Sequence, residues 1–323
     1  MNKVLYIILI SLFSLTIISC AKKSSDDSKT NTDNTTTDNT TSSGLFVAVG
    51  AAGTLLTSSD GTTWNAQTSG TSNNLRAVAY GNSILVVVGY SGTVLRSTDG
   101  TTWNDATALS TTTDNLTNVT YGNSTFMAVG GSGTIITSSD GIQWTSKTSG
   151  TSENLWGIAY GNSTWVANGD NGTIISSSDG TSWDNRTSGT TVEFNGLLYG
   201  NSTFVAVGYS GTILTSDNGT TWTSKTSGTS NEIREVIYDR NIFFGVGEDA
   251  TYIYSQNGTS WSSGSPTGID ASAYLSGVAY GLETWVTVGA SGVIYTIKDE
   301  GTAYTLRTSG TTEHLRRVYS LVE

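Results

Sequence analysis

One stretch of roughly 40 residues recurs through most of this 323-residue chain, and it limits the possible folds more than any other feature. Its clearest copy, Phe204–Trp222, alternates two β-rich runs with two tight-turn sequences, Tyr209-Ser210-Gly211 and Asp217-Asn218-Gly219. An aromatic residue closes each copy at intervals of 39 to 43 residues: Trp64, Trp103, Trp144, Trp183, Trp222, Trp261 and Tyr304. The copies do not keep a helical period, so each predicts several short strands.

The copies predict an all-β, seven-bladed β-propeller with four strands in each blade. A further strand precedes the quoted stretch; these first strands begin at Leu75, Leu116, Leu155, Phe194, Ile233, Leu275 and Leu315. The chain enters the repeats at a second strand, Leu45–Gly50, and leaves after a first strand, Leu315–Val322. We therefore expect the C-terminal strand to pair with the first three strands, which closes the ring without an open sheet edge.

The turn before each closing aromatic residue carries a recurring motif. Thr215-x-Asp217-x-Gly219-x-Thr221-Trp222 matches the Asp-box of sialidase-like propellers, and the other copies have a version one residue shorter, such as Ser58-x-Asp60-Gly61-x-x-Trp64. Over residues 44–323 the chain resembles Asp-box (BNR-like) propellers of the photosystem II assembly-factor-like group. This resemblance implies the propeller fold and a role in protein contact, in a group that helps to assemble a membrane complex.

The Asp-box residues are predicted to be structural. They are Asp60, Asp99, Asp140, Asp179, Asp217, Asn257 and Asp299. A short oxygen-bearing side chain at each place can accept backbone N–H bonds within a tight turn, and a residue that recurs in every copy is a poor candidate for a unique functional group. One carboxylate per turn is also too few oxygen ligands for calcium, so we expect no metal and no cofactor.

The first 19 residues are predicted to be a signal peptide. Lys3 supplies a positive charge, and the apolar run Val4–Ile18 is 15 residues long, which is short for a membrane span. The sequence Ile17-Ile18-Ser19-Cys20 resembles the lipobox of bacterial lipoproteins, which implies a lipid on Cys20 and attachment to a membrane through that lipid. The alternative is an ordinary signal peptide with an incidental cysteine.

Residues 20–43 are predicted to be a disordered tether between that cysteine and the propeller, because after Cys20 they contain almost only Ser, Thr, Asn, Asp and Lys. Ala21 follows the cysteine. By resemblance to the sorting of enterobacterial lipoproteins, this implies the outer membrane of the cell envelope as the destination.

The charge balance disfavours nucleic acid as a partner. The chain has 15 Lys and Arg against 26 Asp and Glu, a formal net charge of −11, and removal of the signal peptide with Lys3 gives 14 − 26 = −12. No basic stripe interrupts this acidic balance. A single cysteine excludes an intramolecular disulfide, so packing must hold the ring together, and we expect a monomer.

Candidate binding residues lie where the copies differ. The turns between second and third strands carry the candidate loop tips Tyr90, Asp170, Tyr209, Glu248 and Asp249. The second residue of each first strand should lie near the mouth of the channel; these residues are Arg76, Thr117, Trp156, Asn195, Arg234, Ser276 and Arg316. Among them Arg76, Trp156, Arg234 and Arg316 could hold a carboxylate, a sulfate or a sugar ring. The alternative is that each arginine pairs with a nearby acid such as Glu232, Glu235 or Glu313.

These features favour a binding protein over an enzyme. A sialidase-like glycoside hydrolase is the catalytic alternative, but the family's Arg-Ile-Pro motif is missing and the chain contains one proline. The single histidine, His314, is a weak catalytic candidate, and the tyrosines recur with the repeat. We therefore expect a lipid-anchored, extracytoplasmic scaffold that recognises a protein or a glycan without catalysis. A surface spacer without a specific ligand is the remaining alternative.

Overall fold

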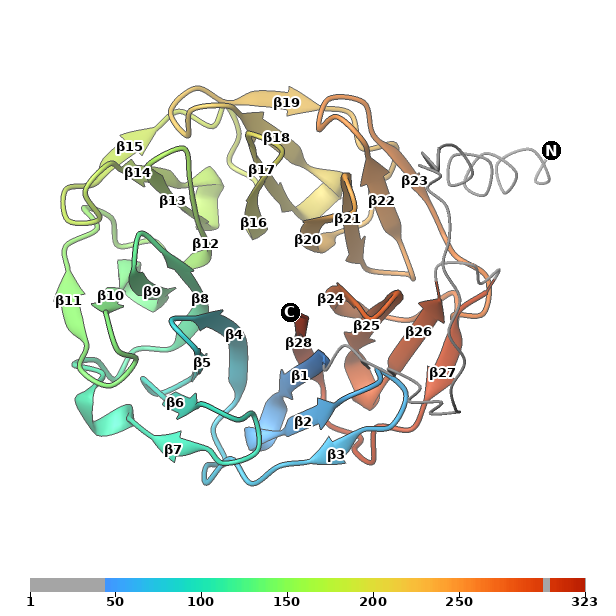
Figure 1. Cartoon of the computed structure of the whole chain (residues 1–323). Coiled ribbons are helices and arrows are strands. Elements are labelled where there is room, and N and C mark those ends of the chain that lie inside the picture. The colour runs from blue at the N-terminus through green and yellow to red at the C-terminus, as the bar shows by residue number, and fades with distance from the viewer. Residues whose placement is uncertain (1–43, 299–302, 323) are drawn as a thin grey trace, which may run out of the picture. The chain divides into compact units, whose positions relative to one another are not determined.

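The computed structural model describes residues 44–298 and 303–322, which form seven four-stranded antiparallel sheets arranged as blades around a channel (Figure 1). The innermost strands are β28 (Leu315–Val322), β4 (Leu75–Gly81), β8 (Leu116–Gly122), β12 (Leu155–Gly161), β16 (Phe194–Gly200), β20 (Ile233–Asp239) and β24 (Leu275–Gly281). The second strands are β1 (Gly44–Gly50), β5 (Ile84–Gly89), β9 (Thr125–Gly130), β13 (Thr164–Gly169), β17 (Thr203–Gly208), β21 (Ile242–Gly247) and β25 (Thr284–Gly289).

The outer half of each blade has shorter strands. The third strands are β2 (Leu55–Ser58), β6 (Val94–Ser97), β10 (Ile135–Ser138), β14 (Ile174–Ser177), β18 (Ile213–Ser216), β22 (Tyr252–Ser255) and β26 (Ile294–Lys298). The outermost strands are β3 (Asn65–Ala66), β7 (Asn104–Asp105), β11 (Thr145–Lys147), β15 (Asp184–Arg186), β19 (Thr223–Lys225), β23 (Ser262–Gly264) and β27 (Thr305–Arg307). Short 3-10 turns are η1 (Ala51–Gly53), η2 (Thr107–Leu109), η3 (Gly131–Gly133), η4 (Asp170–Gly172), η5 (Tyr209–Gly211) and η6 (Ala290–Gly292).

Both ends of the described chain meet in blade one, whose strand order is β28-β1-β2-β3. Strands β28 and β1 pair antiparallel from Gly44 opposite Val322 to Gly50 opposite Leu315. The predicted ring closure, with seven four-stranded blades, is therefore confirmed. The predicted signal peptide, Cys20, the tether and Asp299 lie outside the described residues.

The hydrophobic core lies between neighbouring blades. Between blades one and two, for example, Val47 and Val49 pack with Leu75, Val78 and Leu85, and all five are buried. The alternation of β-branched residues explains this arrangement, since each strand sends successive side chains towards the blades on its two sides. Burial of each such side chain stabilises the fold by about 1.5–3 kcal/mol. The packed blades thus hold the residues that face the channel in fixed positions.

A β-bulge interrupts the pairing of the first and second strands in every blade. In blade two Leu75 pairs with Gly89 and Ala77 pairs with Val88, so Arg76 has no partner in the register. The same shift occurs at the second residue of each other innermost strand. A bulge redirects the extra residue out of the ladder. The side chains of seven bulge residues are in this way turned towards one end of the channel.

Candidate functional site

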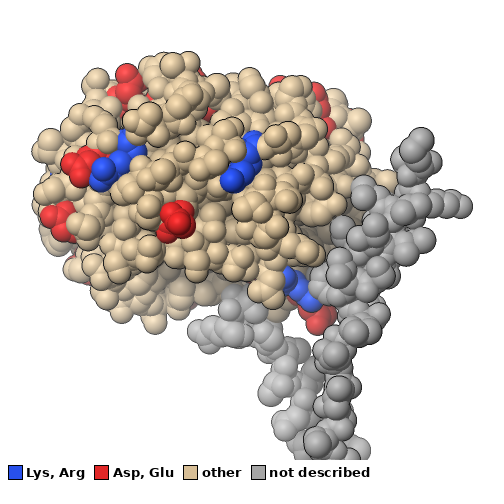
Figure 2. Space-filling view, turned by 90° about the horizontal axis from the view of Figure 1, so that it is seen from above, with Lys and Arg blue, Asp and Glu red and all other residues tan. Residues whose placement is uncertain are grey.

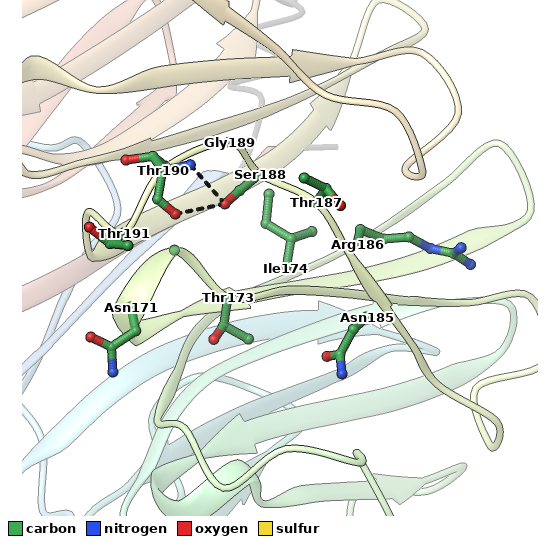
Figure 3. A pocket seen from close by; sticks show the side chains of 11 residues that line it. Asn171, Thr173, Ile174, Asn185, Arg186, Thr187, Ser188, Gly189, Thr190 and Thr191 are labelled. Carbon is green, nitrogen blue, oxygen red and sulfur yellow. Dashed lines mark hydrogen bonds between the residues drawn. The ribbon is translucent and has the colours of Figure 1, made fainter.

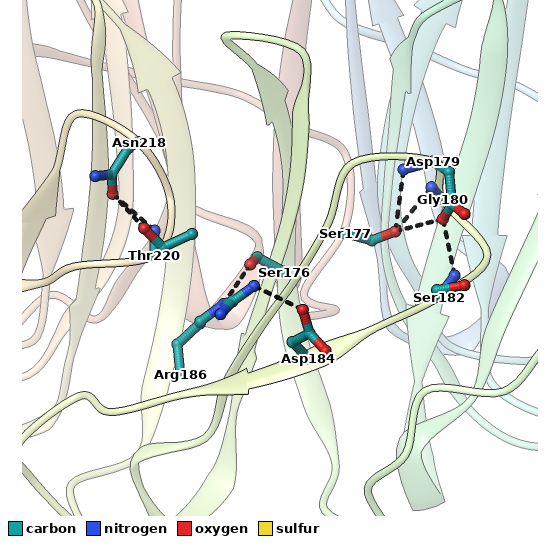
Figure 4. Close-up of polar contacts among 9 residues, drawn as sticks. All are labelled: Ser176, Ser177, Asp179, Gly180, Ser182, Asp184, Arg186, Asn218 and Thr220. Carbon is teal, nitrogen blue, oxygen red and sulfur yellow. Dashed lines mark hydrogen bonds and ion pairs between the residues drawn. The ribbon is translucent and has the colours of Figure 1, made fainter.

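The Asp-box turns on the outer part of the blades are self-contained. In blade four Asp179 Oδ1 accepts the backbone N–H groups of Thr181 and Ser182, both at 2.8 Å. Figure 4 shows the bond from Ser182. Ser177 Oγ donates to the same carboxylate at 3.0 Å and accepts the Gly180 N–H at 2.8 Å. The N–H groups of Ser182 and Thr181 hold the pKa of the Asp179 carboxyl well below its usual range. Local hydrogen bonds therefore engage Oδ1 of this side chain within its own turn.

The same geometry recurs at the other described turns, with one correction to the sequence prediction. Asp60, Asp99 and Asp140 accept backbone N–H groups two and three residues ahead, and Asn257 does so through its amide oxygen. In blade five the accepting residue is Asn218, not Asp217: Asn218 Oδ1 takes the N–H groups of Thr220 and Thr221 at 2.9 and 3.0 Å. Asp217 is exposed beside it, so the blade-five turn has the same length as the others.

The rim of the ring carries two depressions of about 720 and 690 Å³ that are open to solvent. One lies between the blade-four turn η4 and the loop Thr187–Thr191, where Ser188 Oγ accepts the Thr190 N–H at 3.4 Å and donates to its carbonyl at 3.1 Å (Figure 3). A counterpart of the same construction lies in blade five. Figure 2 shows scattered single charges on the side of the ring, without a cluster of one sign. These depressions are products of the repeat and do not single out a ligand.

The mouth of the channel, by contrast, collects the seven bulge residues around one small cavity. Its lining consists of Arg76, Thr117, Trp156, Asn195, Arg234, Ser276, Arg316 and Arg317. The cavity measures about 40 Å³, which is room for a few ordered waters or a small anionic group. All seven positions named from the sequence therefore meet at this one place, which we call the mouth.

Aromatic rings hold two of the mouth arginines in place. The guanidinium carbon of Arg76 lies 5.5 Å from the ring centres of both Tyr90 and Trp156. That of Arg234 lies 5.8 Å from Tyr209 and 4.8 Å from Tyr274. Such cation–π contacts stabilise an arginine without neutralising its charge. The aromatic contacts therefore leave the positive charge of each arginine in place.

Two of the four arginines at the mouth have acid partners. Glu232 Oε2 pairs with Arg234 Nη2 at 2.9 Å, and Glu235 Oε1 pairs with Arg317 Nη1 at 2.6 Å. Within the described part of the chain no acid forms an ion pair with Arg76 or Arg316. The alternative from the sequence, internal pairing, thus holds for Arg234 and fails for the other two named arginines. The mouth therefore keeps two positively charged side chains, Arg76 and Arg316, without an acid partner.

Burial makes these charges costly. Burial and the positive charges of Arg316, Arg317 and Arg234 lower the pKa of Arg76 to about 10, against a smaller raising effect of Tyr90. Burial also lowers the pKa of Arg316. Both side chains stay protonated at neutral pH, but their charged forms are poorly compensated. The buried Nε atoms of Arg234 and Arg316 have no hydrogen-bond partner, so each could donate a hydrogen bond to a ligand.

The loop-tip residues divide into two groups. Tyr90 and Tyr209 contact mouth arginines, and Asp170 accepts a hydrogen bond from Trp156 Nε1 and one of 2.8 Å from Asn154 Nδ2. Glu248 and Asp249 are exposed at the blade-six turn, where Asp249 takes a left-handed conformation with φ of 51°. The first group supports the mouth, while the second stands at the surface of the same face.

Sequence reasoning missed three residues at the mouth. Arg317 lines the cavity directly after the bulge residue Arg316, and Tyr274 comes from the long loop before blade seven. His314 Nε2 lies 2.6 Å from Ser276 Oγ. Burial, together with Arg316, Arg234 and Arg76, lowers the pKa of His314 to about 4, so the imidazole is neutral at physiological pH. The difference between copies at the third residue of each first strand was the signal for Arg317.

Two further features bear on the class of site. Across residues 44–298 and 303–322, no cluster of three His, Cys, Asp or Glu side chains is placed to hold a metal ion. None of the helices in the described part is long and apolar enough to cross a membrane.

The fold and the site together define a seven-bladed β-propeller with a cationic channel mouth. Solved structures of similar fold include YCF48 bound to a D1 peptide, with a TM-score of 0.62 and 18% identity over 78% of this chain and 87% of that chain. YCF48 from Cyanidioschyzon merolae has a TM-score of 0.59 and 16% identity over 75% of this chain and 87% of that chain. The computationally designed Ika8 protein has a TM-score of 0.54 and 16% identity over 76% of this chain and 90% of that chain. No family model and no curated protein matches the sequence. At these identities the similarity is one of fold.

Proposed function

We propose that this chain is a non-catalytic binding protein whose rigid propeller holds an anionic group of a protein or glycan partner at the mouth. The observation that carries the proposal is the pair of half-buried arginines without acid partners, Arg76 and Arg316. These two residues lie on adjacent innermost strands, β4 of blade two and β28 of blade one. Arg234 comes from blade six and lines the same cavity, but it is already paired with Glu232.

An anion is favoured over other ligands by the energetics of the mouth. A charge-assisted hydrogen bond contributes about 1.5–3 kcal/mol, and the buried Nε donor of Arg316 would gain its missing partner. Two such contacts correspond to about two decades or more in affinity. The cavity of about 40 Å³ admits a carboxylate or sulfate group and not a whole domain. The ligand is therefore a side chain, chain end or substituent of a larger partner.

The comparison with YCF48 supports a polypeptide as the larger partner. That protein is found bound to a D1 peptide, on a fold similar to this one at 18% identity. A ring of rigid blades with variable turns on one face suits such contacts, since the partner meets a preformed surface and little ordering is required. The proposed role is thus a scaffold for protein recognition, with a glycan as the second candidate.

The test compares two double variants with the same change of charge. Arg76→Gln/Arg316→Gln removes the unpaired mouth charges, and Arg186→Gln/Arg307→Gln removes two rim charges whose Nε atoms donate to Ser176 and Thr296, both at 2.7 Å. Partners are captured on intact cells with the full chain and their affinities are measured at low and high ionic strength.

We expect the mouth variant to bind about 100-fold more weakly or worse. High salt should mimic this loss, and the rim variant should bind as the wild type does. Equal affinities of wild type and mouth variant would move the site to the tips at Tyr90, Asp170, Tyr209 and Glu248. If neither the wild type nor either variant captures a partner, the alternative of a surface spacer without a specific ligand is favoured.

The proposal includes a lipid anchor at Cys20, which places the propeller outside the cytoplasm on the outer membrane. It is supported by the lipobox-like sequence and by the polar segment that follows it. Cys20→Ala should remove the lipid and release the chain into the soluble fraction. Unchanged partitioning into detergent would remove the anchor from the proposal.

The absence of catalysis is also part of the proposal. The Ser276–His314 pair resembles a nucleophile with its base, but a pKa of about 4 makes His314 a poor base at neutral pH. A fluorophosphonate probe reacts with activated serines. We expect no labelling of the wild type beyond that of Ser276→Ala. Labelling that depends on both Ser276 and His314 would favour the alternative that the protein is a hydrolase.

A further inference from the structure

The channel has a second cavity at the end opposite the mouth, which we call the vestibule. It measures about 440 Å³, which is within the range of small-molecule sites. The innermost strands of all seven blades contribute to its wall. Its polar side chains at depth are Asn118, Glu235 and Arg317, and Arg317 also lines the mouth. The Glu235–Arg317 pair therefore forms the neck between the two cavities.

The wall of the vestibule presents hydrogen-bonding backbone. Each innermost strand is the end of its sheet, so one row of its N–H and C=O groups has no strand partner and faces inward. Side chains that reach this row bond to it: Asn118 Nδ2 donates to Trp156 O at 3.2 Å, and Asn168 Nδ2 donates to Gly196 O at 3.0 Å. Glu235 Oε2 accepts the Val278 N–H at 2.7 Å. The free edge of an antiparallel strand carries both donors and acceptors, and these three contacts occupy some of them.

The charged residues of the vestibule lining are the paired Glu235 and Arg317 at depth and Asp239 at the end of β20. Glu235 and Arg317 lie 2.6 Å apart, and above about pH 7 the ionised carboxylate neutralises the guanidinium. The opening of the vestibule bears five tyrosines, Tyr160, Tyr199, Tyr238, Tyr280 and Tyr319. Four of them pack on the aromatic residue opposite in the second strand, with ring centres 4.6–4.9 Å apart. The opening of the vestibule is therefore rigid and aromatic, and its tyrosine hydroxyls can form hydrogen bonds.

We propose that the vestibule binds a neutral saccharide of one or two sugar units. Each sugar hydroxyl both donates and accepts, which matches a wall that carries both N–H and C=O groups. An anion would find no excess positive charge there, and an apolar molecule would bury wall groups without partners, at about 1–3 kcal/mol for each. The inference stands on the vestibule alone and does not depend on the anion site at the mouth.

The test uses the full chain in a detergent without a sugar head group. Saturation-transfer NMR is recorded with glucose, galactose, mannose, N-acetylglucosamine and their β1–4 disaccharides. Thr120 and Leu198 are half-buried residues of the vestibule wall, and Thr120→Trp or Leu198→Trp would fill the cavity. Thr187→Trp puts the same ring on the exposed rim as a control. Thermal melting establishes that each variant is folded.

We expect at least one saccharide of the panel to bind, with a tenfold or greater loss in a folded filling variant and no loss in Thr187→Trp or Arg76→Gln/Arg316→Gln. In the ¹⁵N-labelled chain the shifts should move at the Asn118 side-chain amide. Three results would overturn the proposal: no member of the panel binds the wild type, binding survives in a folded filling variant, or the rim control abolishes it equally.

Discussion

The outer turns and the channel of this ring are built from the same repeat, but they differ in what they preserve. Every described Asp-box turn repeats one set of hydrogen bonds, whether the acceptor is Asp179 or Asn218. The seven bulge residues that line the mouth include arginine, tryptophan, asparagine, threonine and serine. The turns show what each blade needs in order to fold, and the channel shows where the copies were free to diverge.

The physical reason is the range of the interactions. An Asp-box side chain bonds to N–H groups two and three residues ahead, so its energy depends on its own blade alone. A mouth residue such as Arg76 feels charges and rings from several other blades. Local contacts can be copied unchanged with the repeat, whereas a site that all blades share is asymmetric as soon as one copy changes.

The largest expected effect comes from removing the shared strand. Deletion of Leu315–Glu323 takes away β28, the innermost strand of blade one, and exposes the edge of β1. We expect loss of cooperative unfolding, measured by circular dichroism, and aggregation. A truncated chain that melts as sharply as the wild type would mean that ring closure is dispensable.

The next effect concerns the neck. Glu235→Leu removes the partner of Arg317 and the acceptor of the Val278 N–H in a buried place. Breaking a buried pair from one side costs about 3–5 kcal/mol, because the other charge is left uncompensated. Urea denaturation measures this loss. A loss below about 1 kcal/mol would show that water reaches Arg317 freely.

The neck should also make stability depend on pH. Burial raises the pKa of the Glu235 carboxyl from 4.5 to about 7, although Arg317 and the Val278 N–H act in the opposite direction. Between these values the folded chain holds a proton that the unfolded chain has lost, so stability falls as pH rises through the window. Relative to Glu235→Gln, the melting temperature of the wild type should decline from pH 4.5 to 7 and then level off. A flat difference would contradict the raised pKa.

A smaller effect is expected at a single outer turn. Asp140→Ala removes the acceptor of the Ile142 and Gln143 N–H groups, at about 1–2 kcal/mol. Hydrogen bonds, that of Ile142 first, lower the pKa of Asp140 below 3.8, so its contribution is lost as pH falls below that value. The difference in stability from wild type should shrink in acid, while partner binding stays unchanged. Lost binding at unchanged stability would make the carboxylate functional.

The smallest effect separates two neighbours in blade five. Asn218→Ala should cost about 1 kcal/mol, as the loss of a turn acceptor does. Asp217→Ala changes an exposed side chain and should stay within about 0.5 kcal/mol of the wild type. Parallel urea titrations of both variants decide the order. The reverse order would restore Asp217 to the turn.

The sequence predicted the ring because its signals are local and repeated. The count of blades followed from the spacing of the closing aromatic residues, and the closure followed from the mismatched ends, as the pairing of Gly44 with Val322 confirms. The register of one turn was wrong by a residue, because Asp217 and Gly219 imitate a longer motif. Ser216 Oγ, which accepts the Asn218 and Gly219 N–H groups, sets the true register.

The candidate site was predicted in part. The second residues of the first strands do meet at the mouth, but the neck pair Glu235–Arg317 did not emerge. Simple alternation in a strand assigns neighbouring side chains to opposite faces. A bulge at each second residue breaks this rule, so Arg316 and Arg317 both line the mouth. Pairing across three blades, from β20 past β24 to β28, cannot be read from one repeat.

The position of β28 also sets the order of events when the chain is made. Strands β1 to β3 are synthesised first, while their innermost partner β28 follows the strands of the six other blades. At about 5–20 residues per second, the 272 residues from Gly44 to Leu315 take roughly 15 to 50 s. During that delay β1 has no innermost partner, and the ring can close only once β28 has been synthesised. A chain interrupted before β28 therefore cannot close the ring and stays open to proteases.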